Sequence, residues 1–170
     1  MTDGAISGRA IIAALKQASI EFVISVPDIT TSQSLLWPIA HDDDFRLVRL
    51  CKEDEGVSVC AGLAVTGRRA VLLIQHTGLL DSINAIRGVA CELQQPVCLI
   101  VGLLGKEPNV PPTRSQMFGL RIVEPILDAM GIAHFCIEGQ ADIARLPAAI
   151  AQAYAASRPM AALIGQTVSP

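Results

Sequence analysis

Six short apolar runs recur along this 170-residue chain, separated by segments with the features of helices. Runs of four to six residues rich in Val, Ile and Leu are typical of strands that are buried on both faces. Strands that alternate with helices form right-handed βαβ units, which place the strands parallel in one sheet. The runs are Glu21–Val26, Phe45–Leu50, Val71–Gln75, Val97–Gly102, His134–Ile137 and Met160–Ile164.

The segments between these runs have helical periodicity or helix start and stop residues. In Ser7–Ala18 the apolar residues fall on one face, and Ser7 can cap the first turn. Leu104–Thr113 contains three prolines and is expected to be a loop. We therefore predict one doubly wound α/β domain over residues 1–170, with about six parallel strands and helices on both faces. Further helices are expected at Thr31–Ile39 (capped by Thr30 or Thr31), Asp54–Thr66, Leu79–Leu93, Ser115–Met130 and Asp142–Ala156.

Composition and charge exclude several functional classes. Apolar residues make up 51% of the chain and aromatic residues 4%, which indicates a core of Ala, Val, Ile and Leu. A net charge of −3 gives no electrostatic reason to expect nucleic acid or an anionic membrane as a partner. The five cysteines form no Cys-x-x-Cys pair, and the three histidines are far apart in sequence. Reduced thiols are therefore expected, rather than disulfides or a zinc site.

The sequence also bears on where the protein acts. Met1–Gly4 lacks the basic and apolar segments of a signal peptide, and the longest apolar stretch, Pro96–Gly105, is too short to span a bilayer as a helix. We therefore expect a cytoplasmic protein.

The predicted topology restricts where a ligand can bind. In open parallel sheets, ligands bind at the carboxyl ends of the strands, on the loops that follow them. Most of the polar residues of interest lie on these loops: Pro27–Thr31, Cys51–Glu55, His76–Asp81 and Leu103–Arg114.

Three adjacent carboxylates, Glu53-Asp54-Glu55, follow the second predicted strand. Acidic residues are favourable in the first turn of a helix, where Glu53 or Asp54 can simply act as a cap. A carboxyl that is partly buried at a sheet edge can instead hold a proton near neutral pH. The residues alone leave both interpretations open.

Gln75-His76-Thr77-Gly78 follows the third predicted strand. His76 is a candidate substrate contact or proton shuttle, although a single histidine is more often a structural hydrogen-bonding group. No glycine-rich dinucleotide motif or P-loop is present, and Gly-x-Ser-x-Gly is absent. In the later loop, Lys106 and Arg114 can present cations to an anionic substrate or can be ordinary surface charges.

Four stretches, in this order, resemble the pyrimidine-binding (Pyr) domain of thiamine-diphosphate enzymes. Within that group, the chain is most similar to the α subunit of sulfopyruvate decarboxylase and the N-terminal part of phosphonopyruvate decarboxylase. The likeness covers nearly the full length. The matching stretches are Phe22–Asp28, Glu53–Gly62, Gln75–Leu79 with Ser82–Ala85, and Gln116–Gly119.

The resemblance implies thiamine diphosphate as cofactor and a role for Glu53. In the family, the glutamate nine residues before an Ala-Gly pair hydrogen-bonds N1′ of the aminopyrimidine, and spacing places Glu53 there, with Glu55 as the fallback. A carboxyl at N1′ promotes the imino tautomer that removes the proton from the thiazolium ring. Pro27, Thr77 and Gly78 are the other expected cofactor contacts.

The resemblance also shows what this chain lacks. Related enzymes hold the diphosphate and Mg²⁺ with a Gly-Asp-Gly segment followed by Asn, whereas this chain has no Gly-Asp-Gly and only two asparagines. We expect no metal site here and a β-type partner subunit that carries the diphosphate-binding (PP) domain and holds Mg²⁺. The two chains would share the active site in a hetero-oligomer such as α2β2.

The implied reaction is non-oxidative decarboxylation of a 3-substituted pyruvate, of the sulfopyruvate or phosphonopyruvate type. Relatives usually continue Gly-Leu-Gly-Asn where this chain has Gly78-Leu79-Leu80-Asp81, and an asparagine is common at His76. Two alternatives stay open: a Pyr-like scaffold or regulatory subunit without catalysis, and a flavodoxin-like domain for another ligand. Candidates for contact with the small anionic 2-oxo acid are Asp28, Thr30, Gln75, His76 and Arg114.

Overall fold

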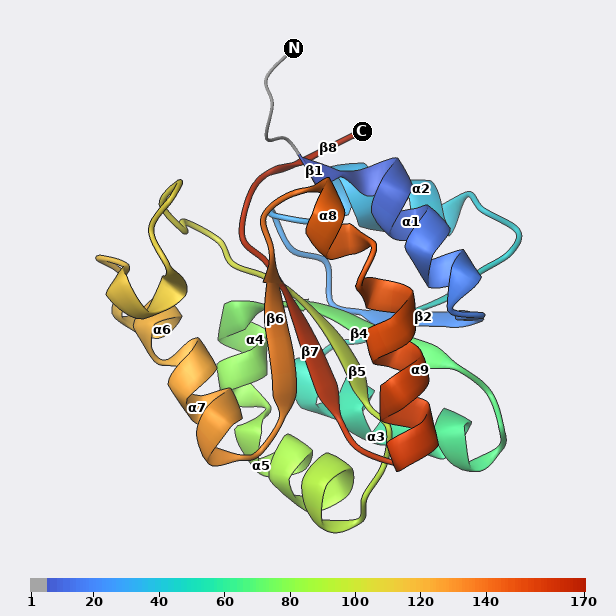
Figure 1. Ribbon diagram of the computed structural model, residues 1–170. Helices are drawn as coiled ribbons and strands as arrows, with labels where there is room; N and C mark the ends of the chain where they lie inside the picture. The colour runs from blue at the N-terminus through green and yellow to red at the C-terminus, as the bar shows by residue number, and fades with distance from the viewer. Residues whose placement is uncertain (1–5) are drawn as a thin grey trace.

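The computed structural model describes residues 6–170, so Met1–Gly4 lies outside the described residues. A six-stranded, fully parallel sheet runs through the molecule in the order β3-β2-β4-β5-β7-β6 (Figure 1). The predicted α/β class, the parallel sheet and its six strands are confirmed. The strands are β2 (Phe22–Ser25), β3 (Arg46–Arg49), β4 (Ala70–Gln75), β5 (Cys98–Gly102), β6 (Ala133–Ile137) and β7 (Met160–Ile164).

Alternation of side chains along the central strands divides the core into two layers. On β5, Ile100 contributes to one layer and Leu99 to the other, because successive side chains of a strand point to opposite faces. Every residue of β5 and β7 is buried, as expected for parallel strands covered on both sides. The edge strand β3 instead exposes Arg46 and Arg49.

Helices cover both faces of the sheet, as predicted (Figure 1). One face carries α1 (Gly8–Gln17), α2 (Trp37–Ala40), α8 (Gln140–Ile143) and α9 (Leu146–Ala156). The other carries α3 (Glu53–Val65), α4 (His76–Asp81), α5 (Ile83–Ala85), α6 (Phe118–Arg121) and α7 (Val123–Ala129).

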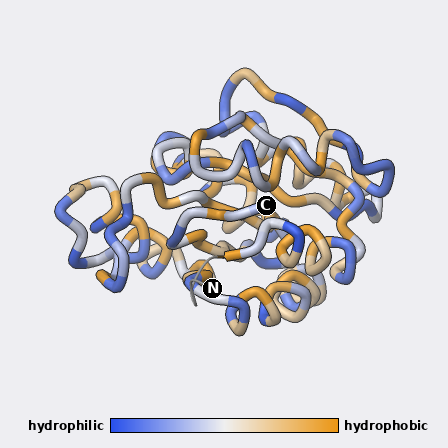
Figure 2. The backbone as a smooth tube through the Cα atoms, turned by 90° about the horizontal axis from the view of Figure 1, so that it is seen from above, coloured by the Kyte–Doolittle hydropathy of each residue, from blue (hydrophilic) through white to orange (hydrophobic). Residues whose placement is uncertain are grey.

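Seen from above, hydrophilic residues lie mostly on the outer turns and loops (Figure 2). No helix among residues 6–170 is long and apolar enough to cross a membrane.

Several helices predicted as continuous are interrupted, and the reason for one break is visible. The helix expected at Leu79–Leu93 begins at His76 and breaks at Ser82, whose hydroxyl donates a hydrogen bond to the Gly78 carbonyl at 2.7 Å. Such a bond within the helix competes with the regular backbone pattern and often bends it. The chain then continues through α5 into a π-helical segment, Ile86–Glu92.

Other boundaries also differ from the predictions. Thr31–Ile39 is a π-helical turn, Ser32–Leu36, followed by α2. The expected helix Ser115–Met130 is divided into α6 and α7, and a short 3₁₀ turn, Pro112–Arg114, precedes it. The sequence did not predict the pairing of β1 (Ile6–Ser7) with β8 (Val168–Ser169), because two-residue strands leave no periodic signal.

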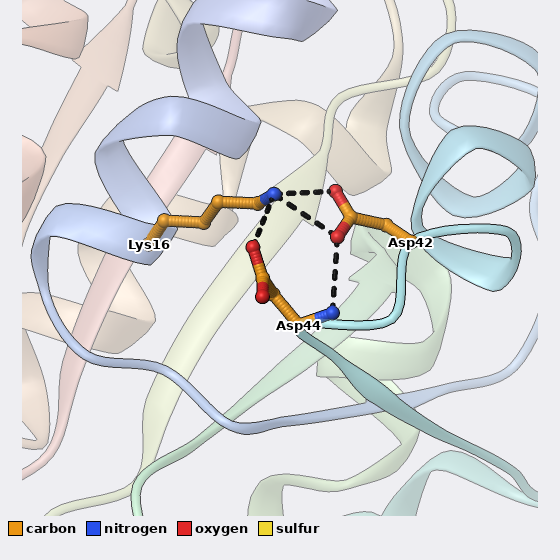
Figure 3. Close-up of polar contacts among 3 residues, drawn as sticks. All are labelled: Lys16, Asp42 and Asp44. Carbon is orange, nitrogen blue, oxygen red and sulfur yellow. Dashed lines mark hydrogen bonds and ion pairs between the residues drawn. The ribbon is translucent and has the colours of Figure 1, made fainter.

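An exposed ion cluster links α1 to the turn before β3 (Figure 3). Lys16 Nζ lies 2.7 Å from Asp42 Oδ2 and 2.7 Å from Asp44 Oδ2. Hydrogen bonds to the two carboxylates raise the pKa of Lys16, and the bond from Lys16 lowers the pKa of Asp42. The cluster borders a hollow of about 460 Å³ at the amino ends of the strands. Ligands of parallel sheets bind at the opposite ends, so we assign this cluster a structural role.

Candidate functional site

The strand order reverses between β2 and β4, because the chain first steps outward to β3 and then returns to the other side of β2. Ligand crevices in open α/β sheets form at such reversals, at the carboxyl ends of the strands. An open hollow of about 480 Å³ lies there. Five of the predicted site residues line it together with Ile29 and Ser32: Pro27, Asp28, Glu53, Gln75 and Thr77.

Glu53 is the first residue of α3, and its half-buried side chain extends across to α4. A Cβ atom at Gly78 would lie 2.4 Å from Glu53 Cγ and 2.5 Å from Glu53 Oε1. The absence of a side chain at Gly78 therefore creates the space that the carboxylate occupies. Gly78 was expected in a turn, but it is the third residue of α4, and its backbone conformation is not one that requires glycine. Close approach to Glu53 explains this residue type.

The three adjacent carboxylates have separate roles. Glu55 is exposed and accepts a hydrogen bond from the backbone N–H of Lys52 at 3.4 Å, which caps α3. Asp54 forms an ion pair with Lys52 Nζ at 3.2 Å. The capping carboxylate is therefore Glu55, and not Glu53 or Asp54 as the capping interpretation had it, whereas Glu53 lines the hollow.

Asp28 stabilises the turn that follows β2. Its Oδ1 accepts hydrogen bonds from the backbone N–H groups of Thr30 and Thr31, at 2.5 and 3.0 Å. Its Oδ2 accepts the Thr31 hydroxyl. Asp28, and not Thr30 or Thr31, is therefore the residue that caps this segment. Its predicted contact with substrate stays a prediction.

His76 begins α4 and is almost completely buried, with 3% of its surface exposed. Burial lowers the pKa of the imidazole, with smaller opposing contributions from a hydrogen bond to the backbone of Gly102 and from the charge of Asp28. Nε2 lies 3.5 Å from the position that a Cβ would take at Gly119, and Leu80 Cδ1 lies 3.9 Å from that position. His76 therefore lies against α6 and does not line the open hollow.

Buried polar atoms without a hydrogen-bond partner concentrate at this edge of the sheet. Within residues 6–170 there are four such side-chain atoms, and three belong to neighbouring parts of the site. These three are Thr30 Oγ1, Ser32 Oγ and His76 Nδ1; the fourth is Glu107 Oε2. Unpaired buried polar groups are rare in folded proteins and need an explanation, such as a ligand or bound water.

The remaining predicted residues are more peripheral. Gln75 Oε1 accepts a hydrogen bond from the Thr77 hydroxyl at 2.9 Å, which fixes both side chains at the rim. Arg114 is exposed in the 3₁₀ turn and does not line the hollow. The Lys106 side chain is 1% exposed and forms an ion pair with Glu138 at 2.5 Å. The interpretation of Lys106 as an ordinary surface charge is therefore wrong.

The structure adds features that the sequence did not reveal. Asp81 forms an exposed ion pair with Lys52 at 3.2 Å, so its charge is balanced beside the site. Ile29 and Phe118 are 82% and 67% exposed, and Met117 is also exposed. These three exposed apolar side chains, which we call the apolar rim, lie on the segments that follow β2 and β5. Sequence patterns do not identify them, because apolar residues usually indicate the core.

The described part of the chain contains no cluster of three or more His, Cys, Asp and Glu side chains that could hold a metal ion. All five cysteines are free thiols, as predicted. Burial raises the pKa of Cys98 to about 12 and also raises that of Cys60, so both behave as core residues.

Comparisons with known proteins give a consistent result. No protein-family model matches the chain. It is 32% identical over 123 residues to sulfopyruvate decarboxylase subunit alpha of Methanocaldococcus jannaschii, which covers 72% of this chain and 71% of that protein. It is 31% identical to the subunit of the same name from Methanothermobacter thermautotrophicus, over 69% of this chain and 74% of the relative. It is also 29% identical to sulfopyruvate decarboxylase of Methanosarcina acetivorans, over 93% of this chain but only 40% of that longer protein.

Proposed function

Because this chain belongs to the family of sulfopyruvate decarboxylase alpha subunits, we propose that it is one half of a thiamine-diphosphate-dependent decarboxylase. The proposed substrate is a 3-substituted pyruvate, and the names of the relatives favour sulfopyruvate over phosphonopyruvate. Residues 1–170 would form the pyrimidine-binding domain. The observation that carries the proposal is the Glu53 carboxylate, which lies over Gly78 in a hollow at the strand-order reversal.

The hollow has the features that an aminopyrimidine requires. It is open, and its floor includes one carboxylate, Glu53, that no other side chain engages in a hydrogen bond or ion pair within residues 6–170. The hydroxyl of Ser32, another residue of the lining, is buried and has no hydrogen-bond partner among residues 6–170. Thiamine diphosphate, when bound, supplies the electron sink for cleavage of the carbon–carbon bond. The role of this chain is to hold and exchange the proton at N1′ through Glu53.

The other residues of the hollow would orient the ring and the substrate. Pro27 and Thr77 are exposed and line the same hollow as Glu53, and they would contact the pyrimidine, with Gly78 beneath it. Gln75 accepts a hydrogen bond from Thr77, and we propose that it contacts substrate. We propose the substrate side for Asp28, Thr30 and His76 as well, and for Arg114 only if the partner folds its loop inward.

The partner subunit is proposed because this chain has no metal-binding cluster among its described residues and only two asparagines, Asn84 and Asn109. The match to the Methanosarcina acetivorans protein leaves about 60% of that protein outside the alignment. We propose that this remaining part of the Methanosarcina acetivorans protein contains a diphosphate-binding domain in the same chain. We propose that a separate β-type subunit carries this domain, binds Mg²⁺ and assembles with this chain as α2β2 or a larger complex.

Reconstitution tests the proposal directly. The chain should be co-expressed with a candidate β subunit that contains Gly-Asp-Gly and a later Asn. We expect CO₂ release from sulfopyruvate that requires both chains, thiamine diphosphate and Mg²⁺. A stable complex without turnover on any 2-oxo acid in a panel would instead support the scaffold alternative. Tight binding of a different ligand by this chain alone would support a flavodoxin-like domain.

The apolar rim of Ile29, Met117 and Phe118 is the surface we expect the partner to cover. An exposed Phe that becomes buried at an interface commonly contributes strongly to affinity. Phe118→Ser should therefore weaken subunit association about tenfold or more. Leu93→Ser is the matched control, because Leu93 is also 67% exposed but lies just before β5, at the amino ends of the strands. Equal affinities of the two variants, measured by calorimetry, would exclude the rim from the interface.

A further inference from the structure

A second hollow lies at the carboxyl ends of the strands, beside the one that contains Glu53. It has a volume of about 210 Å³ and is lined by Ile29 and Thr30 after β2, Leu103–Lys106 after β5 and Gly165–Thr167 after β7. Ile29 lines both hollows, so the two are neighbours. Ligands of parallel sheets bind at this edge, and a hollow of this size is suited to a small group rather than to a whole cofactor.

The lining of the second hollow includes a lysine whose charge is buried. The side chain of Lys106 is 1% exposed, and its Nζ lies 2.5 Å from Glu138 Oε1 and donates a hydrogen bond to the Glu107 carbonyl at 3.3 Å. An ammonium group has three N–H donors, so these two contacts leave one donor for a ligand. A Cβ at Gly165 would lie 3.3 Å from Lys106 Cδ and 3.1 Å from Glu138 Cγ. The ion pair therefore packs against a residue that lines the hollow.

The two charges of this ion pair are buried to different extents. The Glu138 side chain is 42% exposed, so its carboxylate can turn toward water at little cost. Lys106 cannot do so, because a buried ammonium group needs an anion in contact with it. Glu107 is also close enough to interact with the charge of Lys106, but its carboxylate is held by the backbone N–H of Gln116 at 2.8 Å. Glu138 is therefore the partner that an incoming anion can replace.

We propose that the second hollow binds the anionic group on C3 of the substrate, a sulfonate or phosphonate, with Lys106 as its cation in place of Glu138. Both groups are tetrahedral oxyanions with three oxygens that accept hydrogen bonds. Besides the ammonium group, the lining offers the uncharged donors of Thr30, Gln166 and Thr167. The Thr30 hydroxyl is buried and has no hydrogen-bond partner among residues 6–170. That the anion belongs to a substrate rests on the function proposed above, whereas its binding at Lys106 does not.

The test is an NMR titration of the isotope-labelled chain with sulfoacetate, at constant ionic strength because salt screens such contacts. We expect saturable amide shifts at Gly105, Lys106 and Gln166. Lys106→Met, which retains the apolar stem and removes the charge, should weaken this binding about tenfold or more. Glu138→Gln, which removes the competing carboxylate, should strengthen it about three- to tenfold. Lys16→Met should leave the affinity unchanged and is the control, because Lys16 is also paired with carboxylates but lies at the amino ends of the strands.

Several results would overturn this assignment. One is a titration of the unmodified chain in which sulfoacetate gives no saturable shift, or shifts only residues outside the second hollow; this result needs no variant to fold. Another is the same set of shifts, with the same affinity, from acetate, which lacks the sulfonate. Unchanged binding by Lys106→Met, or binding by Glu138→Gln that is no tighter than that of the unmodified chain, would show that the ion pair is only structural.

The reconstituted enzyme separates this inference from the proposed function. Lys106→Met should lower kcat/KM for sulfopyruvate about tenfold or more, mainly through KM, because the anionic group is bound equally in the ground state and the transition state. A normal kcat/KM in this variant would refute the subsite and leave the proposed function intact. Sulfoacetate binding at Lys106 in a complex that turns over no 2-oxo acid would refute the proposed function and leave the anion site intact.

Discussion

Replacement of Glu53 by Gln should lower decarboxylation by the assembled enzyme about 10²- to 10⁴-fold, the range typical for loss of a proton-transferring side chain. Gln has nearly the same shape, so the contact with Gly78 and the fold should be retained. An amide cannot take up and release the proton at N1′. The measurements are kcat/KM for sulfopyruvate, together with the affinity for the partner subunit and for thiamine diphosphate, which should change much less than turnover.

Glu55→Gln is the matched control, since Glu55 lies two residues further along the same helix and carries the same chemical group. Its carboxylate accepts the Lys52 N–H outside the hollow, so its removal should cause a small loss of stability and near-normal turnover. The opposite pattern, with Glu55→Gln inactive and Glu53→Gln active, would show that the spacing assigned the wrong carboxylate.

Much of the fold could be predicted from the sequence, because buried parallel strands have a strong local signal. The six apolar runs correspond to β2 through β7 within one or two residues at each end. Helix interiors were less predictable. The break at Ser82 depends on a hydroxyl that bonds to the Gly78 carbonyl, and the expected helix at 115–130 is divided into α6 and α7. Neither effect changes the spacing of apolar residues.

The site was predicted less completely. Topology and spacing brought Pro27, Asp28, Glu53, Gln75 and Thr77 to one hollow, because the carboxyl ends of parallel strands meet at one edge. The burial of His76 was not visible in the sequence, since it depends on how segments far apart in the chain pack together. The local bonds of Asp28 were missed, although Asp commonly forms such bonds in turns. The ion pair of Lys106 with Glu138 joins residues from separate segments, which single-sequence reasoning cannot pair.

Gly78→Ala should separate stability from activity, because the added methyl group acts differently on each. Within α4 an alanine is intrinsically favourable by about 1 kcal/mol over glycine. The new Cβ would, however, lie 2.4–2.6 Å from three atoms of the Glu53 side chain. That side chain is flexible and can move aside, so the chain should fold with little change in melting temperature while the carboxylate is displaced. A displacement of about 1 Å at a reacting group can cost on the order of 10²-fold in rate.

The expected result is therefore a loss of about 10- to 100-fold in kcat/KM with an intact fold. Gly88→Ala is the control, because Gly88 is also helical but no atom lies within 4 Å of its Cβ position. It should leave turnover unchanged. The double variant with Glu53→Gln should be no slower than Glu53→Gln alone, since both changes remove one interaction. If Gly78→Ala retains full activity, the carboxylate does not act from the position it occupies here. If instead the double variant is slower than Glu53→Gln alone, Gly78 acts on the cofactor independently of the Glu53 carboxylate.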